Sequence, residues 1–139
     1  MKKILPLLFV ILTIAVAPAF TVAYSTTETV PLKITYYATG TIKGYSYSSK
    51  MQVLVDGNEV GESPVKNQEV SNSFTVQVPK GNHELKCIMW AQTKEGVWEE
   101  RLEANGYSFD WTYSASMNFK KKNKLKIEFN ITNRESVRH

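Results

Sequence analysis

Few side chains in this sequence could do acid–base or metal chemistry. Its 139 residues include two histidines and one cysteine. His83 and Cys87 fall on the same face of a predicted strand, but four strand residues span roughly 13 Å, too far for both to bind one metal ion. We therefore expect no metal and no other cofactor, and we expect Cys87 to be a buried, unreactive thiol.

Hydrolytic chemistry also lacks a motif. A Ser-His-Asp triad would need His83 as its base, and no serine stands in the context of a nucleophile elbow. A glycosidase needs two carboxylates about 5–9 Å apart, and Glu100 and Asp110 on adjacent predicted strands are one possible pair. Charged sheet faces produce such pairs routinely. The sequence therefore predicts no catalytic residue and no enzyme.

Aromatic side chains outside the predicted core are the clearest sign of ligand binding. Tyr45 and Tyr47 stand in a segment rich in Gly and Ser, residues 40–50, which could be a mobile loop or a short irregular strand. With Trp98 they could form a platform on which sugar rings stack, because one end of these side chains is apolar and the other polar. The alternative is ordinary surface.

One dense basic cluster is present, and it has two interpretations. It could be a solvated hairpin tip followed by a charged edge strand that resists edge-to-edge pairing. It could instead be a contact point for an anionic surface, such as a phospholipid or a cell-wall polymer. The lysines of this second interpretation are Lys120, Lys121, Lys122 and Lys124, and Lys126 extends the cluster.

The N-terminus has the pattern of a secretory signal peptide. Lys2 and Lys3 precede a nearly unbroken apolar run, residues 4–17, and small residues follow it. We expect residues 1–23 to be a signal peptide cleaved after Ala23, with an uncleaved anchor as the alternative. Cleavage lowers the net charge from +4 to +2, which is too small to indicate nucleic-acid binding. The predicted location is secreted or periplasmic, with no membrane span after cleavage.

The rest of the chain reads as strands. From Tyr107 to Phe119 the odd positions are mostly aromatic or apolar and the even positions are polar, and the alternation resumes from Leu125 to Ile131. Two such runs joined by a short polar connection predict a hairpin. Similar alternation marks residues 30–36, 51–55 and 74–78. Residues 83–91 indicate a strand with two apolar faces, central or covered on its second face by a loop, and residues 97–103 indicate a charged strand.

These patterns predict one all-β domain over residues 24–139. About seven strands, closely spaced turn signals and no helical period indicate an antiparallel, immunoglobulin-like β-sandwich, with an open barrel as the alternative. We expect residues 133–139 to be a frayed polar C-terminus.

Residues 51–91 resemble a PEGA domain, a small surface module of bacteria and archaea. The resemblance lies in a strand, the Asp56-Gly57 turn, a short strand ending at Gly61, the following Pro64, and a later Lys80-Gly81 turn before His83. The Pro-x-Gly-Ala lead-in of that family is absent. The resemblance implies a PEGA-like sandwich in the cell envelope, with a structural or binding role and no catalytic residues.

We therefore expect a non-enzymatic exported module that contacts a protein or the cell envelope. Two alternatives remain open from the sequence. One is a carbohydrate-binding module that uses Tyr45, Tyr47 and Trp98. The other is an inhibitor of an extracellular hydrolase that presents residues 40–50. In each case the partner is a protein or glycan at the cell surface or in the periplasm.

Overall fold

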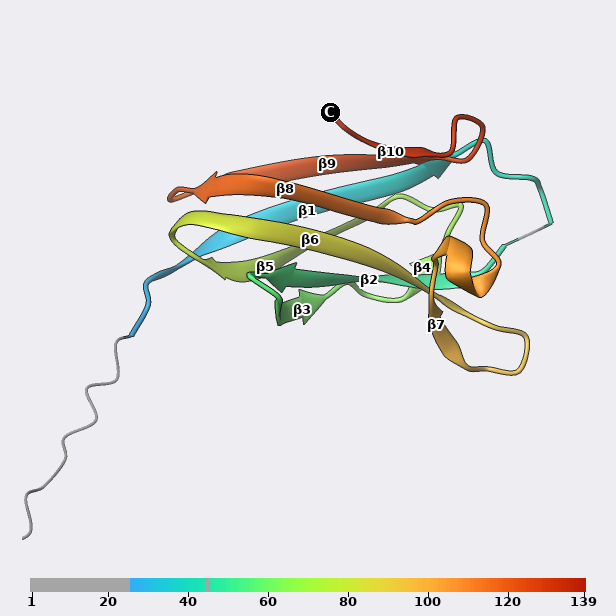
Figure 1. Ribbon diagram of the computed structural model, residues 1–139, viewed down its shortest axis with the longest axis horizontal. Helices are drawn as coiled ribbons and strands as arrows, with labels where there is room; N and C mark the ends of the chain where they lie inside the picture. The colour runs from blue at the N-terminus through green and yellow to red at the C-terminus, as the bar shows by residue number, and fades with distance from the viewer. Residues whose placement is uncertain (1–25, 45) are drawn as a thin grey trace, which may run out of the picture.

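The computed structural model describes residues 26–44 and 46–139 (Figure 1). The predicted signal peptide, residues 1–23, and Tyr45 lie outside the described residues. The described chain forms ten strands and one short 3-10 helix. They are β1 (Thr29–Thr39), β2 (Ser48–Val55), β3 (Asn58–Glu62), β4 (Lys66–Asn67), β5 (Asn72–Pro79), β6 (Gly81–Gln92), β7 (Trp98–Glu100), η1 (Glu103–Asn105), β8 (Thr112–Phe119), β9 (Asn123–Asn130) and β10 (Glu135–Arg138).

The strands form two sheets that pack face to face, which confirms the predicted all-β sandwich (Figure 1). One sheet has the order β10-β9-β1-β5. In the other, β3, β2 and β6 are neighbours, β7 and β8 both pair with β6, and β4 pairs with the start of β2. The strand number exceeds the predicted seven partly because β4 and β10 are too short to show an alternating pattern.

The predicted hairpin between the two C-terminal alternating runs is wrong. β8 pairs antiparallel with β6, whereas β9 pairs parallel with β1 and antiparallel with β10. The lysine-rich connection crosses from one sheet to the other, so Phe119 and Leu125 enter the core from opposite sides. Alternation determines which face of a strand is buried, but it does not determine the neighbouring strand.

The C-terminus was predicted to be frayed, but in the structure it is ordered by strand pairing. β10 pairs with β9 from Glu135↔Asn130 to Arg138↔Ile127. Arg134 has a φ of 57°, a left-handed conformation that helps to turn the chain back onto β9. The backbone N–H of His139 then donates to the carbonyl of Lys126 at 3.0 Å. Backbone pairing therefore fixes a segment whose polar composition gave no strand signal.

The core lies between the sheets and is rich in aromatic rings. Trp111 stacks between Phe109 and Phe129, with ring centroids 5.1 and 5.3 Å apart. Phe109 and Trp111 belong to the β7–β8 connection and Phe129 to the other sheet, and all three side chains are buried in the core. These contacts confirm the inward-facing aromatic pattern of residues 107–119, although the pattern begins before the strand does.

A buried cluster of three hydrogen-bonded polar side chains joins the two sheets. The hydroxyls of Tyr36 and Ser63 are hydrogen-bonded at 2.8 Å, and the side-chain amide of Asn72 donates to Tyr36 at 2.8 Å. Ser63 also accepts a hydrogen bond from the backbone N–H of Met51. Burial raises the pKa of Tyr36. The hydroxyls of Tyr36 and Ser63 and the side-chain N–H group of Asn72 are therefore satisfied inside the core, whereas Oδ1 of Asn72 accepts no hydrogen bond among the described residues.

The predicted Asp56-Gly57 turn is present between β2 and β3. Asp56 and Gly57 have φ values of 51° and 80°, and two consecutive positive values are what a type I′ hairpin turn requires. At Gly61, a Cβ atom would lie 2.8 Å from a methyl of Val76, so glycine allows β3 to approach β5. These two glycines therefore serve the backbone.

Candidate functional site

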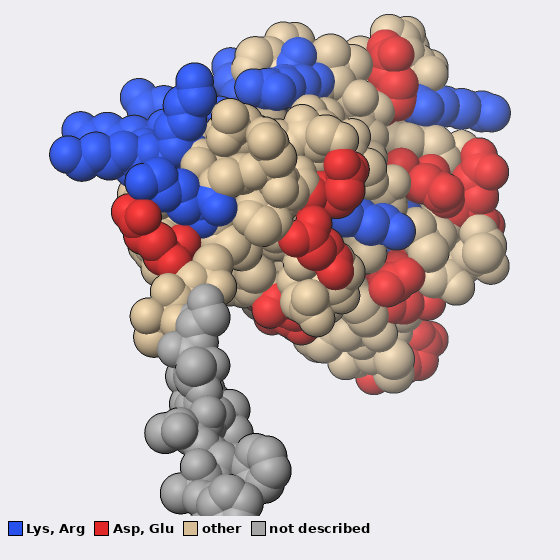
Figure 2. Space-filling view, turned by 60° about the vertical axis from the view of Figure 1, so that its left-hand side comes forward, with Lys and Arg blue, Asp and Glu red and all other residues tan. Residues whose placement is uncertain are grey.

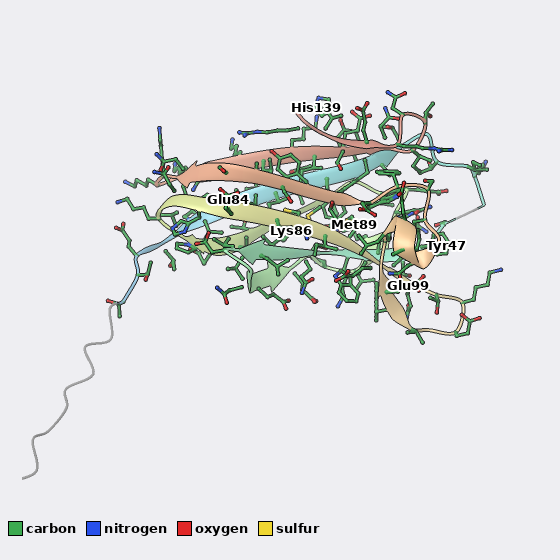
Figure 3. The ribbon with its side chains drawn as sticks, viewed as in Figure 1. Tyr47, Glu84, Lys86, Met89, Glu99 and His139 are labelled. Carbon is green, nitrogen blue, oxygen red and sulfur yellow. The ribbon has the colours of Figure 1, made fainter. Side chains whose placement is uncertain are left out.

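Three connections meet at one end of the sandwich, which we call the loop end. They are the β1–β2 connection (residues 40–47), the β6–β7 turn (residues 93–97) and the β7–β8 connection (residues 101–111). Figure 3 shows Tyr47 and Glu99 at this end, whereas Glu84 lies on β6 toward the other end. The opposite end contains the β5–β6 and β8–β9 turns, and we call it the lysine end.

The β7–β8 connection is a loop with both ends tied to β6. The N–H of Arg101 donates to the carbonyl of Met89 at 2.9 Å, and the N–H of Met89 donates to the carbonyl of Trp111 at 3.0 Å. The N–H of Trp111 donates in turn to the carbonyl of Arg101 at 2.8 Å. Residues 102–110 project from the sheet edge as a loop, and the hydrogen bond between Arg101 and Trp111 closes its base.

Arg101 is buried inside an aromatic cage at the base of this loop. Only 4% of the residue is exposed, and its guanidinium carbon lies 3.4 Å from the ring centroid of Trp111. The corresponding distances to Tyr107 and Tyr47 are 5.1 and 5.7 Å. Its Nη1 donates to Oε1 of Gln68 at 2.8 Å. Arg101 therefore joins the β1–β2 connection, the β4–β5 segment and the β7–β8 loop.

No carboxylate neutralises this cation directly. Among residues 26–44 and 46–139, Arg101 has no ion pair, and residues 1–25 and 45 contain no Asp or Glu. Burial lowers the pKa of Arg101 to about 10, which leaves it charged at neutral pH. The faces of the surrounding rings are negative, so they compensate part of the lost hydration.

Tyr107 extends the cage toward the surface. Its hydroxyl donates to Oε1 of Glu99 at 2.7 Å. Burial is the main cause that raises the pKa of Tyr107 to about 12, and the hydrogen bond to Glu99 adds to it. Tyr107 also packs edge to face on Tyr47, with ring centroids 6.5 Å apart. The two tyrosines therefore hold fixed positions between Arg101 and the solvent.

Tyr47 lies where three surface hollows adjoin, with volumes of about 220, 280 and 330 Å³. The first is lined by Ile42 and the Arg101 cage, the second by Glu99, Asn105 and Tyr107, and the third by Ser46, Ser48 and Gln92. Aromatic faces, amides and a carboxylate are therefore available to one ligand at the loop end. Tyr47 is one of the residues that the sequence analysis singled out, and its role in ligand binding stays a prediction.

The structure does not bring Trp98 together with Tyr47. Trp98 lies on the outer face of the β6 sheet, where Nζ of Lys50 is 5.1 Å from its ring centroid. Glu99, the next residue, points the other way and contacts Tyr107. Tyr45 lies outside the described residues. The predicted three-residue platform is therefore not formed by Tyr47 and Trp98.

The predicted basic residues lie at and near the lysine end. Lys120, Lys121 and Lys122 are exposed in the β8–β9 turn, and Lys124 is exposed on β9. β9 lies between β1 and β10, but β10 pairs with it only from Ile127 to Asn130. Among the described residues, Lys124 therefore lies where one edge of β9 has no neighbouring strand, which agrees with the interpretation of these lysines as protection of an edge strand.

In the part of the chain that the structure describes, the other polar side chains are not arranged as a catalytic triad. The ring nitrogens of His83 contact Oδ2 of Asp56 at 2.6 Å and the carbonyl of Lys80 at 3.2 Å. The Ser116 hydroxyl donates to Glu84 and not to His83. Asp110 accepts the backbone N–H of Glu103 at 2.8 Å, a bond within the loop. Within the described residues no group of three His, Cys, Asp or Glu side chains could hold a metal ion.

Sequence reasoning missed Arg101 and Gln68. Arg101 is two residues from Glu99 in a predicted charged strand, so both side chains were expected on the same, solvent-exposed face. One signal was available: Arg101 is the only basic residue between Glu95 and Asp110. A lone cation in an acidic segment that ends in aromatic residues can be the centre of a cage.

Comparisons of the chain with family models, curated proteins and solved structures find no match. The fold and the loop end define an all-β sandwich with a preformed aromatic surface at one end. In residues 26–44 and 46–139, no helix is long and apolar enough to span a bilayer.

Proposed function

We propose that this chain is a non-enzymatic exported module that binds a protein partner, in the cell envelope or outside the cell, through its loop end. The observation that carries the proposal is the position of Tyr47 among three adjoining hollows, next to the caged Arg101. The signal-peptide pattern and the resemblance of residues 51–91 to PEGA domains support an extracytoplasmic setting.

The loop end has the composition of a protein-binding surface. Ile42 and Val97 are 68% and 60% exposed, and Ile42 lines one hollow together with the half-buried Tyr47 and Tyr107 and with Arg101. Tyrosine supplies a large contact area at a low entropic cost, which is why interfaces are enriched in it. Because Arg101 already fixes both tyrosines, a partner would lose little free energy in ordering them.

The charge of the loop end favours a neutral or basic partner. Its exposed or half-exposed carboxylates outnumber its exposed lysines; they are Glu69, Glu95, Glu99, Glu103 and Asp110, against Lys43, Lys66 and Lys94. Complementary charge at the rim of an interface raises the association rate and discriminates among partners. A basic surface of an extracellular hydrolase would satisfy this condition, so inhibition of such an enzyme remains an alternative form of the proposal.

Affinity capture tests the proposal. The immobilised full-length protein would be exposed to envelope and secreted proteins of the cells that produce it. Wild type should retain a protein that Tyr47→Ala and Ile42→Glu fail to retain. Tyr37→Ala, which removes a half-buried tyrosine from the outer face of the other sheet, should retain it. Equal loss in all three variants, with unchanged melting temperatures, would remove the proposal.

A second candidate function is glycan binding on the outer face of the β6 sheet. Trp90 lies opposite Lys50 in register, and its Nε1 donates to Oε1 of Gln52 at 3.1 Å. Lys50 also lies over Trp98 and pairs with Glu62 at 3.0 Å. Two half-exposed indoles beside amide and charged groups are the combination that sugar rings favour.

Tryptophan fluorescence separates the two candidates. Titration with soluble N-acetylglucosamine oligomers should change the fluorescence of wild type and of Tyr47→Ala if the outer face binds glycans, but not that of Trp98→Ala. A response that depends on Tyr47 would assign the glycan to the loop end. The absence of any response across oligosaccharides of different sugars would remove the candidate.

A further inference from the structure

We propose that the lysine end of the sandwich docks on a membrane surface that contains anionic phospholipids. This inference concerns the end opposite the loop end and does not depend on the proposed function. It rests on the arrangement of the lysines, on the absence of acidic partners for them, and on the place where the chain enters the domain.

The lysines form one continuous surface. Lys120, Lys121 and Lys122 occupy the β8–β9 turn, and Lys124 follows on the outer face of the β9 sheet. Lys33 on β1 is the register partner of Lys124. Lys33, Lys124 and Lys126 line a shallow hollow of about 260 Å³ together with Thr35 and His139. Figure 2 shows a dense group of Lys and Arg along the upper left of the molecule, bordered below by a small acidic group, whereas most Asp and Glu lie toward the centre and right of this view.

Acidic side chains do not neutralise this surface. Within residues 26–44 and 46–139, none of its lysines forms an ion pair. The acidic residues nearby have other partners: Glu28 pairs with Lys80 of the β5–β6 turn, Asp56 with His83, Glu84 with Ser116, and Glu128, on the same face of β9 as Lys124 and Lys126, with His139. The positive field of the lysine end is therefore directed to the solvent, where it can attract an anionic surface.

Folding alone does not explain this arrangement. Neighbouring strands lie about 4.8 Å apart, so the register places Lys33 and Lys124 side by side, and like charges in such positions destabilise a sheet. Protection of the part of β9 that β10 leaves uncovered accounts for Lys124, but it gives no reason for a second lysine at position 33, because Lys33 pairs with β5 on one side and with β9 on the other. An anionic ligand that neutralises both lysines would account for the presence of two like charges at these paired positions.

The direction of the chain favours a membrane over a soluble polyanion. Thr29, the first residue of β1, pairs with Pro79, and Gly81 pairs with Phe119, so the chain enters the domain at the lysine end. Figure 1 shows this entry and the β8–β9 turn at the same end. The apolar run of residues 4–17 precedes this point in the sequence. An anchored form would therefore present its lysine end to the bilayer.

Vesicle co-sedimentation tests the proposal with protein recovered from cells that express the full chain. Vesicles of phosphatidylcholine with phosphatidylglycerol should bind the protein at least tenfold better than vesicles of phosphatidylcholine alone, since each lysine near an anionic surface contributes roughly fivefold. Raising the salt from about 0.1 M to about 1 M should abolish the difference, because it shortens the Debye length from about 10 Å to about 3 Å.

Two variants with equal net charge locate the contact. Lys120→Glu, Lys121→Glu and Lys122→Glu in one chain should reduce binding by more than about tenfold. Lys43→Glu, Lys66→Glu and Lys94→Glu, three exposed lysines toward the loop end, should change it less than about twofold. Replacing Lys120, Lys121 and Lys122 by Arg should preserve binding, because charge is retained.

Three results would overturn the proposal. Equal losses in the two Glu variants would mean that only net charge matters. Binding that does not depend on phosphatidylglycerol would assign the contact to apolar insertion. Binding of soluble polyphosphate without binding of anionic vesicles would assign the lysines to a soluble polyanion. Melting temperatures of all variants, measured alongside, exclude unfolding as the cause.

Discussion

The guanidinium of Arg101 stacks on the indole of Trp111, with 3.4 Å between the guanidinium carbon and the ring centroid. Trp111 is in turn stacked on Phe109 and Phe129 of the core. A surface loop and the hydrophobic core are therefore joined through one cation–aromatic contact. Because Arg101 also contacts Tyr47 and Tyr107, this contact determines the shape of the loop end.

Substitutions of Arg101 should separate the effects of its volume from those of its charge. Arg101→Ala leaves a cavity beside Trp111 and removes one hydrogen bond to Gln68, so we expect a loss of about 2–4 kcal/mol in the free energy of unfolding. Arg101→Met keeps much of the volume and removes a buried charge, so we expect a loss of about 1 kcal/mol. Urea denaturation measures both. Equal losses would show that the cation itself stabilises the cage.

Cys87 should be unreactive in the folded protein. The residue is fully buried, and burial raises the pKa of its thiol to about 12, so the thiolate is scarce at neutral pH. We expect a thiol reagent such as iodoacetamide to modify Cys87 only after denaturant is added, and mass spectrometry would show this. Rapid modification of the native protein at pH 8 (about half a unit below the pKa of a free thiol) would contradict the buried position.

The Asp56–His83 pair should make stability depend on pH. Its hydrogen bond with Asp56 raises the pKa of His83, so the His83 contribution is complete below about pH 6.5 and is lost as pH rises through the folded pKa. Bonds from the Glu84 backbone N–H and from His83 lower the pKa of Asp56, so its contribution is complete above about pH 4 and is lost in more acidic solution.

The pair should therefore stabilise the fold most between about pH 4 and pH 6.5. We expect the difference in melting temperature between wild type and His83→Gln to be larger near pH 5 than near pH 9, because the charged form of His83 is lost as the pH rises through its folded pKa. A difference that is constant over this range would show that the ion pair adds nothing to the neutral hydrogen bond.

The lysines at the lysine end should oppose stability. Lys33→Gln removes a like-charge neighbour of Lys124, so we expect a rise of roughly 1–3 °C in the melting temperature at low salt. The same variant should bind anionic vesicles more weakly than wild type. At about 1 M salt the gain in stability should disappear, because the repulsion is screened. A drop in melting temperature at low salt would show that Lys33 has a stabilising role.

The sequence predicted the strand faces better than the strand partners. Alternation identified the buried positions of β1, β2, β5 and β9, and the Asp56-Gly57 pair identified a tight turn. The sequence pattern did not reveal that β9 lies parallel to β1, because long-range strand pairing depends on the path of the whole chain. It also missed β10, whose four residues pair through the backbone alone.

The candidate site was predicted only in part, for a related reason. Tyr47 stood out because a Gly/Ser-rich segment gives an aromatic ring nothing nearby to pack on. Arg101 did not stand out, because its burial results from an interruption between β7 and β8 that no local pattern announces. Trp98 was grouped with Tyr47 by residue type, and the strand geometry places it on the outer face.

Site-specific crosslinking tests the central claim, recognition of a protein partner through the loop end, most directly. A photoreactive phenylalanine analogue would replace Ile42 at the loop end and, as the matched control, Gln77, an exposed residue on β5. After irradiation of the producing cells, we predict a discrete protein adduct from position 42 and none from position 77. Adducts of equal yield at both positions, or none at position 42 in protein that is folded and exported, would contradict the claim.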